Sequence, residues 1–292
     1  MAAAPQQEFD IPYRVISITD KTHKTSYPAI SPSRPALSQA GRTVLITGGS
    51  GGIGYGIALA FATAGAARVI IVGRDEAKQQ AAVASLAAEA GSGSHTKFEG
   101  RAASPGSPEN IDSLWDALAS EGVLVDVLVL NAAVTGNSLE RSLWARGWES
   151  TWEQFVVHVR SRYLVNVATS AIHDWDAGVN TKSYALTKNS GVLLLQQLAR
   201  DSPVSKMQIV SFHPGAILSP GAKNAGATER TLDWDDISLP SSVAIWAASD
   251  EAAFLHGRFI WSAWDVEELR SGPLRERIEQ DEQYLRIGVH GV

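Results

Sequence analysis

Tyr184 and Lys188 are the residues whose types and spacing most directly suggest chemistry. They stand four positions apart in SYALTK, so in a helix they share one face. A free tyrosine has a pKa of about 10 and transfers protons poorly at neutral pH. A nearby lysine ammonium favours the phenolate and lowers that pKa, which suits the tyrosine to pass a proton to or from a carbonyl oxygen. Alone, this spacing occurs by chance in many chains.

The glycine-rich segment TGGSGGIG, residues 47–54, predicts a second functional feature. It follows a short apolar run, TVLITG, and opens an alanine-rich segment typical of a helix. Glycines there let the backbone turn tightly and approach a pyrophosphate, while the free amides and dipole of the helix N-terminus bind the anion. A merely tight strand-to-helix turn is the alternative. In this context the segment predicts a dinucleotide site.

Arg74 follows the next apolar run, RVIIVG, where the ribose of the adenosine would be recognised. An acid at this place would accept hydrogen bonds from a 2′-hydroxyl, whereas a cation suits a 2′-phosphate. The first acid, Asp75, comes only after the arginine. Because a guanidinium pairs with phosphate in a forked geometry, we expect NADP (NADPH), with NAD the weaker alternative. Arg74 could instead be a solvated residue that leads into the next helix.

Apolar runs alternate with helical patterns along most of the chain. Five apolar runs are typical of buried strands: TVLITG (43–48), RVIIVG (68–73), VDVLVLNAA (125–133), YLVNVAT (163–169) and KMQIVSF (206–212). HTKFEG (95–100) is predicted to be a further strand. Unbroken apolar strands that alternate with helices indicate a parallel sheet covered on both faces. The sequence therefore predicts an α/β fold with a doubly wound parallel sheet, a Rossmann-type three-layer α/β/α arrangement in one domain.

Composition sets the limits of this domain and its partners. Prolines gather early, so residues 1–40 are expected to form a flexible arm, with one short strand possible at YRVISI. The dinucleotide-binding and catalytic domain would cover residues 41–270. Residues 271–292 would form a charged helical tail. The net charge of −6 argues against binding nucleic acid or an anionic membrane. Without cysteine there are no disulfides or thiolate metal sites, and no histidine spacing suggests a metal. No signal or spanning segment is apparent, so we expect a cytoplasmic protein.

Taken together, these motifs resemble the short-chain dehydrogenase/reductase family in its compact single-domain branch. The matching segments are TGGSGGIG, LNAA (130–133), SYALTK and HPGAILS (213–219), and their order and spacing fit from residue 43 to about 220. The lead-in SPSRPALSQAGRTVLITGG and the segment GRFIWSAWDVEEL (257–269) are similar to a fungal subgroup. The resemblance implies an oxidoreductase that interconverts a carbonyl and an alcohol on a small organic substrate.

The resemblance also implies roles for individual residues. Tyr184 would donate the proton in carbonyl reduction, and Lys188 would hold the nicotinamide ribose. Asn131 would lie at the adenosine side of the cofactor, and the turn at Pro214–Gly215 would contact the nicotinamide end. The implied cofactor-binding set is Gly48, Ser50, Gly52, Ile53, Gly54, Arg74, Asn131, Tyr184, Lys188, Pro214, Gly215, Ile217 and Ser219.

Two parts of the substrate side are less clearly matched. The family places a serine about a dozen residues before the tyrosine, where it hydrogen-bonds the substrate oxygen. Here Ser170 lies 14 residues before Tyr184, with Thr169 beside it. Either hydroxyl could serve, and Ser170 is the preferred third catalytic residue. The segment AILSPGAKNAGATERTLDWDD, rich in small residues, is expected to cover the substrate as a mobile lid.

The segment TWEQFVVHVRSRYLVNVATS, residues 151–170, departs most from the family. Its first half is typical of an amphipathic helix and its second of a buried strand, with only Ser161 and Arg162 between them. In the family this helix carries an active-site asparagine, here His158, and runs for several more turns. Ten helical residues span about 15 Å, roughly half of what is needed to cross the sheet. We therefore expect that about 20–25 residues are absent after Arg160, through a deletion or a natural shortening.

This shortening would have two consequences. His158 would either replace the asparagine in proton transfer or mark the loss of that function. The helix 183–200 would keep part of an apolar surface, including Val192, Leu193 and Leu194, uncovered. The chain would then be less stable, and the helix-paired homo-oligomer usual for the family becomes doubtful. The alternative function is a catalytically impaired dinucleotide-binding protein of the same fold, a scaffold or a remnant.

Overall fold

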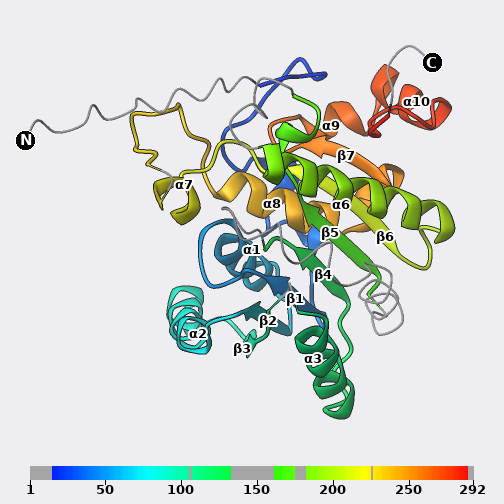
Figure 1. Cartoon of the computed structure of the whole chain (residues 1–292). Coiled ribbons are helices and arrows are strands. Elements are labelled where there is room, and N and C mark those ends of the chain that lie inside the picture. The colour runs from blue at the N-terminus through cyan, green and yellow to red at the C-terminus, as the bar shows by residue number, and fades with distance from the viewer. Residues whose placement is uncertain (1–14, 105–106, 133–160, 175–181, 225, 289–292) are drawn as a thin grey trace, which may run out of the picture.

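One parallel sheet of seven strands organises the protein (Figure 1). The computed structural model describes residues 15–104, 107–132, 161–174, 182–224 and 226–288. The strand order is β3-β2-β1-β4-β5-β6-β7, and every pairing is parallel. The strands are β1 (Thr43–Thr47), β2 (Arg68–Gly73), β3 (Lys97–Ala102), β4 (Val127–Leu130), β5 (Tyr163–Val167), β6 (Gln208–His213) and β7 (Arg258–Trp261).

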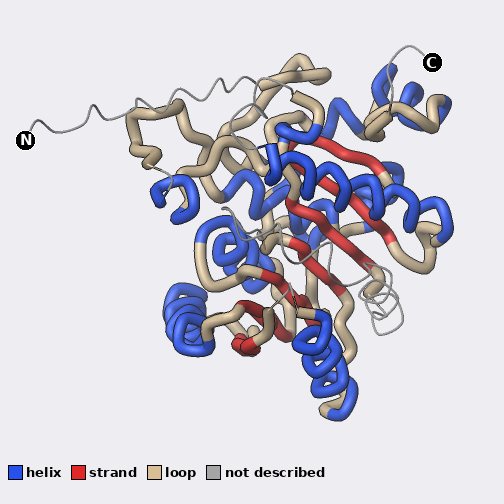
Figure 2. The backbone as a smooth tube through the Cα atoms, in the orientation of Figure 1, coloured by secondary structure: helices blue, strands red, loops and turns tan. Residues whose placement is uncertain are grey.

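Helices cover the sheet on both faces, as Figure 2 shows. The helices are α1 (Gly52–Thr63), α2 (Glu76–Ala90), α3 (Pro108–Ser120), α6 (Lys182–Asp201), α7 (Pro220–Asn224), α8 (Ser238–Ala247), α9 (Val266–Leu269) and α10 (Gly272–Gln280). The core has two parts, one containing side chains of α1, α2 and α8 and the other containing side chains of α3 and α6. The predicted three-layer, doubly wound fold is confirmed.

Strand β1 shows why the strands read as unbroken apolar runs. Val44 and Ile46 point into one part of the core, and Leu45 points into the other. Successive strand side chains alternate between faces, and here both faces are covered by helices. Strand β1 also pairs with β2 on one side and β4 on the other. The strands before β4 are therefore added on one side of β1, and β4 and the later strands on the other side. Parallel sheets bind ligands in the crevice at such a switch point, here beyond the carboxyl ends of β1 and β4.

All six strands predicted from the sequence are present, but β7 was missed. It is only four residues long and begins with Arg258, a charged residue that burial would normally exclude. Its guanidinium is buried because it donates hydrogen bonds to backbone carbonyl oxygens near the C-terminus, among them that of Ile278 at 2.6 Å. Ile278 belongs to α10, which lies within the tail predicted to be helical, and the other acceptors follow that helix.

Residues 15–40 belong to the folded domain, so the prediction of a poorly structured arm is wrong for them. Ile30 and Leu37, in the 3-10 turns η1 (Pro28–Ile30) and η2 (Pro35–Leu37), are fully buried. Thr22 forms an antiparallel bridge with Trp264, 242 positions away. Two of the prolines that indicated disorder, Pro28 and Pro35, instead open these 3-10 turns. Of the proposed strand YRVISI, the described part, 15–18, is not a strand.

Strand β5 begins at Tyr163, where the sequence predicts a buried strand. Ser161 is buried, and its Oγ donates to the carbonyl oxygen of Val125 at 3.0 Å. The Tyr163 hydroxyl contacts Asp250 at 2.7 Å, and its ring lies beneath the guanidinium of Arg42. These contacts fix the start of β5 in the sheet. The helix expected at 151–160, His158 and the proposed gap after Arg160 lie outside the described residues.

The apolar surface of α6 differs from the one predicted. Val192 is fully buried in the core, whereas Leu193 is 38% exposed and Leu186 is 67% exposed. Leu186 and Leu193 are seven positions apart, so they share one helix face. Leu194 is half-buried. The expectation of an uncovered side chain is wrong for Val192, and the predictions about stability and dimer formation stay predictions.

Candidate active site

The loop between β1 and α1 is built for close backbone contacts. Gly48 and Gly52 have φ of +70° and +55°, the left-handed region that favours glycine. Gly54 has no such backbone, but a Cβ there would lie 2.4 Å from the Gly48 carbonyl oxygen. A Cβ on Gly49 would lie 2.5 Å from a methyl carbon of Ile71. No larger side chain fits at Gly49 or Gly54, which are both buried, so these two positions require glycine.

Asn131 fixes this loop from the end of β4. Its side-chain Nδ2 donates to the carbonyl oxygens of Thr47 and Gly48, at 3.0 and 3.2 Å. In return, Thr47 Oγ1 accepts the backbone N–H groups of Asn131 and Ala132, both at 3.0 Å. The Asn131 amide therefore holds the β1–α1 loop against the end of β4. This contact is consistent with its predicted place beside a cofactor.

The residues of this crevice fit a dinucleotide. Helix α1 begins after Gly51, which provides no side-chain cap, and its first turn contains no acid. Free N–H groups at such a helix end bind a pyrophosphate. The segment after β6 reaches the same place, because a Cβ on Gly52 would lie 3.5 Å from Ser219 Cβ and 3.2 Å from Pro220 Cδ. The structure thus brings together two parts of the predicted cofactor site, Gly52 and Ser219.

Arg74 lies at the end of β2, next to this loop. The Gly48 N–H donates to the carbonyl oxygen of Val72 at 2.7 Å, which joins the loop to that strand end. Asp75 caps α2 by accepting the Lys78 N–H at 3.0 Å, so the first acid after the strand is already engaged. The Arg74 side chain is exposed, and no hydrogen bond or ion pair joins it to another residue in the described ranges.

Tyr184 and Lys188 lie in the first two turns of α6, against the end of β5. Lys188 Nζ donates to the carbonyl oxygen of Val167 at 2.7 Å, and burial lowers its pKa to about 8. Burial raises the pKa of Tyr184, and a hydrogen bond with Thr169 acts in the opposite direction. The expected lowering of the Tyr184 pKa by Lys188 is not found. Desolvation exceeds any such effect here, and the amine is engaged with a backbone carbonyl.

Thr169 and Ser170 occupy different environments at the start of η4 (Ser170–Ile172). Thr169 provides the hydroxyl that contacts Tyr184, and its Oγ1 also accepts the Ala171 N–H at 3.3 Å. Ser170, the preferred candidate from the sequence, is buried. Spacing could not separate two adjacent hydroxyls, because the turn of the backbone after β5 decides which of them faces α6.

The turn after β6 carries the other predicted cofactor residues. Gly215 has a φ of +91°, and the next residue, Ala216, is held by Asp235. Asp235 Oδ2 accepts the Ala216 N–H at 2.8 Å, and the Asp235 N–H donates to the Ala216 carbonyl oxygen at 2.8 Å. The sequence reasoning missed Asp235, because nothing in the run DWDD distinguishes its three acids. Ser219 accepts the Ala222 N–H and caps α7.

The depressed pKa of Lys188 gives a testable pH dependence of stability. Between its lowered pKa of about 8 and its ordinary 10.5, the folded chain binds fewer protons than the unfolded chain. The free energy of unfolding should therefore rise with pH across this window. Lys188→Met should lack that rise. Urea denaturation of both proteins without cofactor, from about pH 7 to about pH 10.5, measures the difference between their free energies of unfolding. A difference that does not change with pH would contradict the lowered pKa of Lys188.

The sequence and fold also match known proteins. A family model for short chain dehydrogenases matches residues 42–230. The chain belongs to the short-chain dehydrogenase family. It is 34% identical to the short chain dehydrogenase/reductase AacuD of Aspergillus aculeatus over 283 residues, covering 93% of this chain and 96% of that protein. It is 36% identical to a short chain dehydrogenase/reductase of Claviceps purpurea over 289 residues, covering 92% and 93%. The family predicted from the motifs, with its fungal affinity, is confirmed.

Solved structures share the fold of this short-chain dehydrogenase. RhlG of Pseudomonas aeruginosa, in an NADP complex, matches with a TM-score of 0.65 at 23% identity, over 78% of this chain and 97% of RhlG. L-sorbose reductase of Gluconobacter frateurii, in complex with NADPH and L-sorbose, matches with a TM-score of 0.63 at 19% identity, over 77% and 96%. Within the described ranges, no helix has the length and apolar character needed to cross a membrane.

Family membership defines the reaction class. The protein is an NAD(P)-dependent oxidoreductase that acts on CH–OH groups of small molecules. The glycine loop, the free end of α1 and the turn after β6 would hold the nicotinamide dinucleotide. When bound, this cofactor supplies or accepts the hydride. The protein's own residues must bind it, orient the substrate and move one proton.

Proposed function

We propose that this short-chain dehydrogenase uses NADPH to interconvert a carbonyl and an alcohol on a small organic substrate, with Tyr184 as the proton donor. One observation carries the proposal: the Tyr184 hydroxyl is hydrogen-bonded to Thr169, just after β5, and the Lys188 amine donates to the carbonyl oxygen of Val167 at the end of that strand. This end lies two strands from β1 in the sheet. A carbonyl placed there is within reach of a proton donor and of a dinucleotide bound at the glycine loop.

Each of the three residues has a distinct role in carbonyl reduction. Tyr184 gives its hydroxyl proton to the carbonyl oxygen as the carbon receives hydride, which yields the neutral alcohol. Its raised pKa keeps the phenol protonated at neutral pH. Thr169 would supply the hydroxyl that the family takes from serine, since it is the one beside Tyr184. Lys188, with a pKa of about 8, is largely protonated at neutral pH and would hold the nicotinamide ribose.

A carbonyl screen tests the function directly. The purified protein and NADPH would be mixed with a panel of small ketones and aldehydes, and consumption of NADPH followed by its absorbance. At least one reduced product is expected, identified as the alcohol by mass spectrometry. NADPH binding without turnover on a broad panel would instead favour the impaired dinucleotide-binding protein.

Arg74 supports NADPH over NADH as the cofactor. Solved relatives of this fold were obtained with NADP, NADPH and also NAD, so the fold alone permits both. An exposed guanidinium beside the loop would pair with the 2′-phosphate. NADPH should bind more tightly than NADH by about 1.5–3 kcal/mol, the range for hydrogen bonds to charged groups.

Substitution of Arg74 tests this preference. Arg74→Ala should weaken NADPH binding by that amount and leave NADH binding unchanged, as measured by fluorescence titration. Arg200→Ala removes an exposed arginine from the last turn of α6 and serves as the matched control for lost charge. Equal affinities for the two cofactors in the unaltered protein would refute the assignment.

A further inference from the structure

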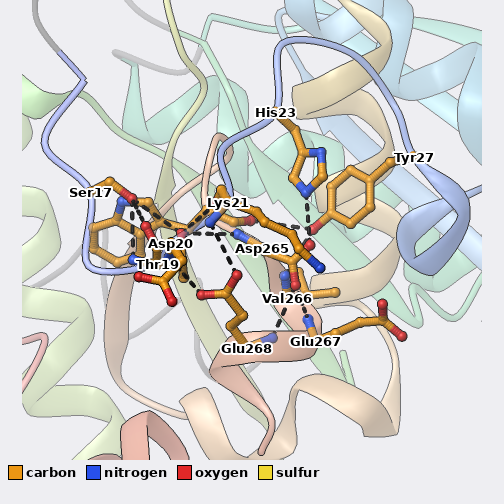
Figure 3. Close-up of polar contacts among 11 residues, drawn as sticks. Ser17, Thr19, Asp20, Lys21, His23, Tyr27, Asp265, Val266, Glu267 and Glu268 are labelled. Carbon is orange, nitrogen blue, oxygen red and sulfur yellow. Dashed lines mark hydrogen bonds and ion pairs between the residues drawn. The ribbon is translucent and has the colours of Figure 1, made fainter.

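The segment 17–27, here called the N-terminal strap, is bound to the residues that follow β7 (Figure 3). The His23 N–H donates to the Ala263 carbonyl oxygen at 2.8 Å, and the His23 ring contacts Asp265 Oδ2 at 2.8 Å. The Tyr27 hydroxyl accepts the Val266 N–H at 2.9 Å. Tyr27 also stacks on His23, with ring centroids 3.6 Å apart. The strap is therefore fixed along its length to the carboxyl side of the sheet.

The same strap binds the end of the segment that follows β6. The Lys24 carbonyl oxygen accepts the Asp236 N–H at 2.7 Å, and Lys24 Nζ donates to the Asp233 carbonyl oxygen at 3.0 Å. The Ser26 N–H donates to Ser238 Oγ at 3.1 Å. These contacts hold residues 233–238 from outside. None of them involves a residue of the predicted site.

Asp235 lies between these strap contacts and points toward the site. The residue is 6% exposed, and it makes two hydrogen bonds to Ala216, one through Oδ2 and one through its backbone N–H. Gly215 packs so closely on the carboxylate that a Cβ there would lie 2.5 Å from Oδ2. A two-sided contact of this kind sets the position of the turn, because a buried N–H without its acceptor is costly. The strap fixes residue 236, and residue 235 fixes the turn.

We propose that Asp235, anchored by the N-terminal strap, is the positioning residue that sets the turn at 214–217 against the nicotinamide half of the cofactor. The inference rests on the proposed function to the extent that this turn contacts the nicotinamide. Asp235 touches neither the substrate nor the reacting atoms, and it acts through Ala216. The adenosine half is held elsewhere, by the β1–α1 loop and Arg74. Loss of the Asp235 side chain should therefore weaken the binding of the nicotinamide half and leave the binding of the adenosine half unchanged.

Comparing a whole cofactor with its adenosine half tests this inference. Asp235→Ala should weaken NADPH binding about tenfold, which corresponds to about 1.4 kcal/mol. Binding of adenosine 2′,5′-bisphosphate, which lacks the nicotinamide, should not change. Asp235→Asn keeps an oxygen that can accept the Ala216 N–H, and it should restore NADPH binding close to the original value. Calorimetric titration measures both ligands, and circular dichroism confirms that each variant is folded.

Ser238→Ala tests the anchor separately and remains informative if Asp235→Ala fails to fold. It removes the acceptor of the Ser26 N–H at the far side of the segment, so a smaller loss of NADPH affinity in the same direction is expected. An equal loss of affinity for NADPH and for adenosine 2′,5′-bisphosphate would show that Asp235 has a general structural role. Unchanged NADPH affinity in both variants would show that the turn needs no anchor. Either result overturns the inference. Since the readout is binding, it is independent of whether any carbonyl is turned over.

Discussion

Replacing Tyr184 by phenylalanine is expected to lower turnover by roughly 10²-fold or more, the range for loss of a general acid. The substitution removes the hydroxyl proton and leaves the aromatic ring in place. Because burial raises the pKa of Tyr184, the unaltered residue is a protonated donor at neutral pH. NADPH affinity should stay nearly unchanged, since the phenylalanine ring fills the same space. Steady-state rates on the best substrate of the carbonyl screen, with a parallel NADPH titration, measure both quantities.

Three further variants place this result in context. Lys188→Ala should damage both turnover and NADPH binding, because the amine is expected to hold the nicotinamide ribose. Thr169→Val removes the hydroxyl beside Tyr184 with little change in volume, and Ser170→Ala does the same for the neighbouring buried hydroxyl. Only the threonine variant should approach the Tyr184→Phe defect. A Tyr184→Phe protein with the original rate would show that the proton donor lies elsewhere.

The parts of the fold that follow from local pattern were predictable. Apolar runs such as those at β1 and β6 are buried on both faces, so their sequence reports the environment directly. The strap and β7 depend instead on contacts between distant parts of the chain. Arg258 is compatible with burial only because carbonyl oxygens near the C-terminus accept its N–H groups. The His23 side chain is held by Asp265, 242 positions away. Periodicity contains no information about such pairs.

The candidate site likewise combines features that local sequence motifs predict with features that depend on distant contacts. The glycine loop and the Tyr184–Lys188 pair are local motifs, and the structure places the first at the start of α1 and the second at the start of α6. The electrostatics could not be read from spacing, because the pKa of a side chain depends on its burial and neighbours. Thus Tyr184 has a raised pKa although a lysine lies one helical turn away. The choice between Thr169 and Ser170 likewise depends on backbone direction after β5, and Asp235 acts through a turn that precedes it by 19 positions.

The glycine loop supports the second large effect, which concerns Gly54. A Cβ at this position would lie 2.4 Å from the Gly48 carbonyl oxygen and 2.5 Å from Asn131 Nδ2. Both are far inside van der Waals contact, and the first is backbone that cannot rotate away. Gly54 has an ordinary helical φ, so alanine would otherwise be favoured there by about 1 kcal/mol. The contact alone decides the outcome.

Gly54→Ala is therefore expected to reduce NADPH binding by more than tenfold, an effect above about 1.4 kcal/mol, and to destabilise the protein by about 1–3 kcal/mol, as overpacking does. The alanine methyl must push Gly48 and Asn131 apart, which breaks the hydrogen bonds between the ends of β1 and β4 and displaces the N–H groups that would bind the pyrophosphate. Gly191→Ala is the matched control, since that glycine also lies in a helix and a Cβ there meets nothing within 4 Å. It should gain stability and keep NADPH affinity. Calorimetric titration measures the NADPH affinity of both variants, and thermal melts measure their stability. If Gly54→Ala binds NADPH as tightly as Gly191→Ala does, the dinucleotide is not bound at this loop.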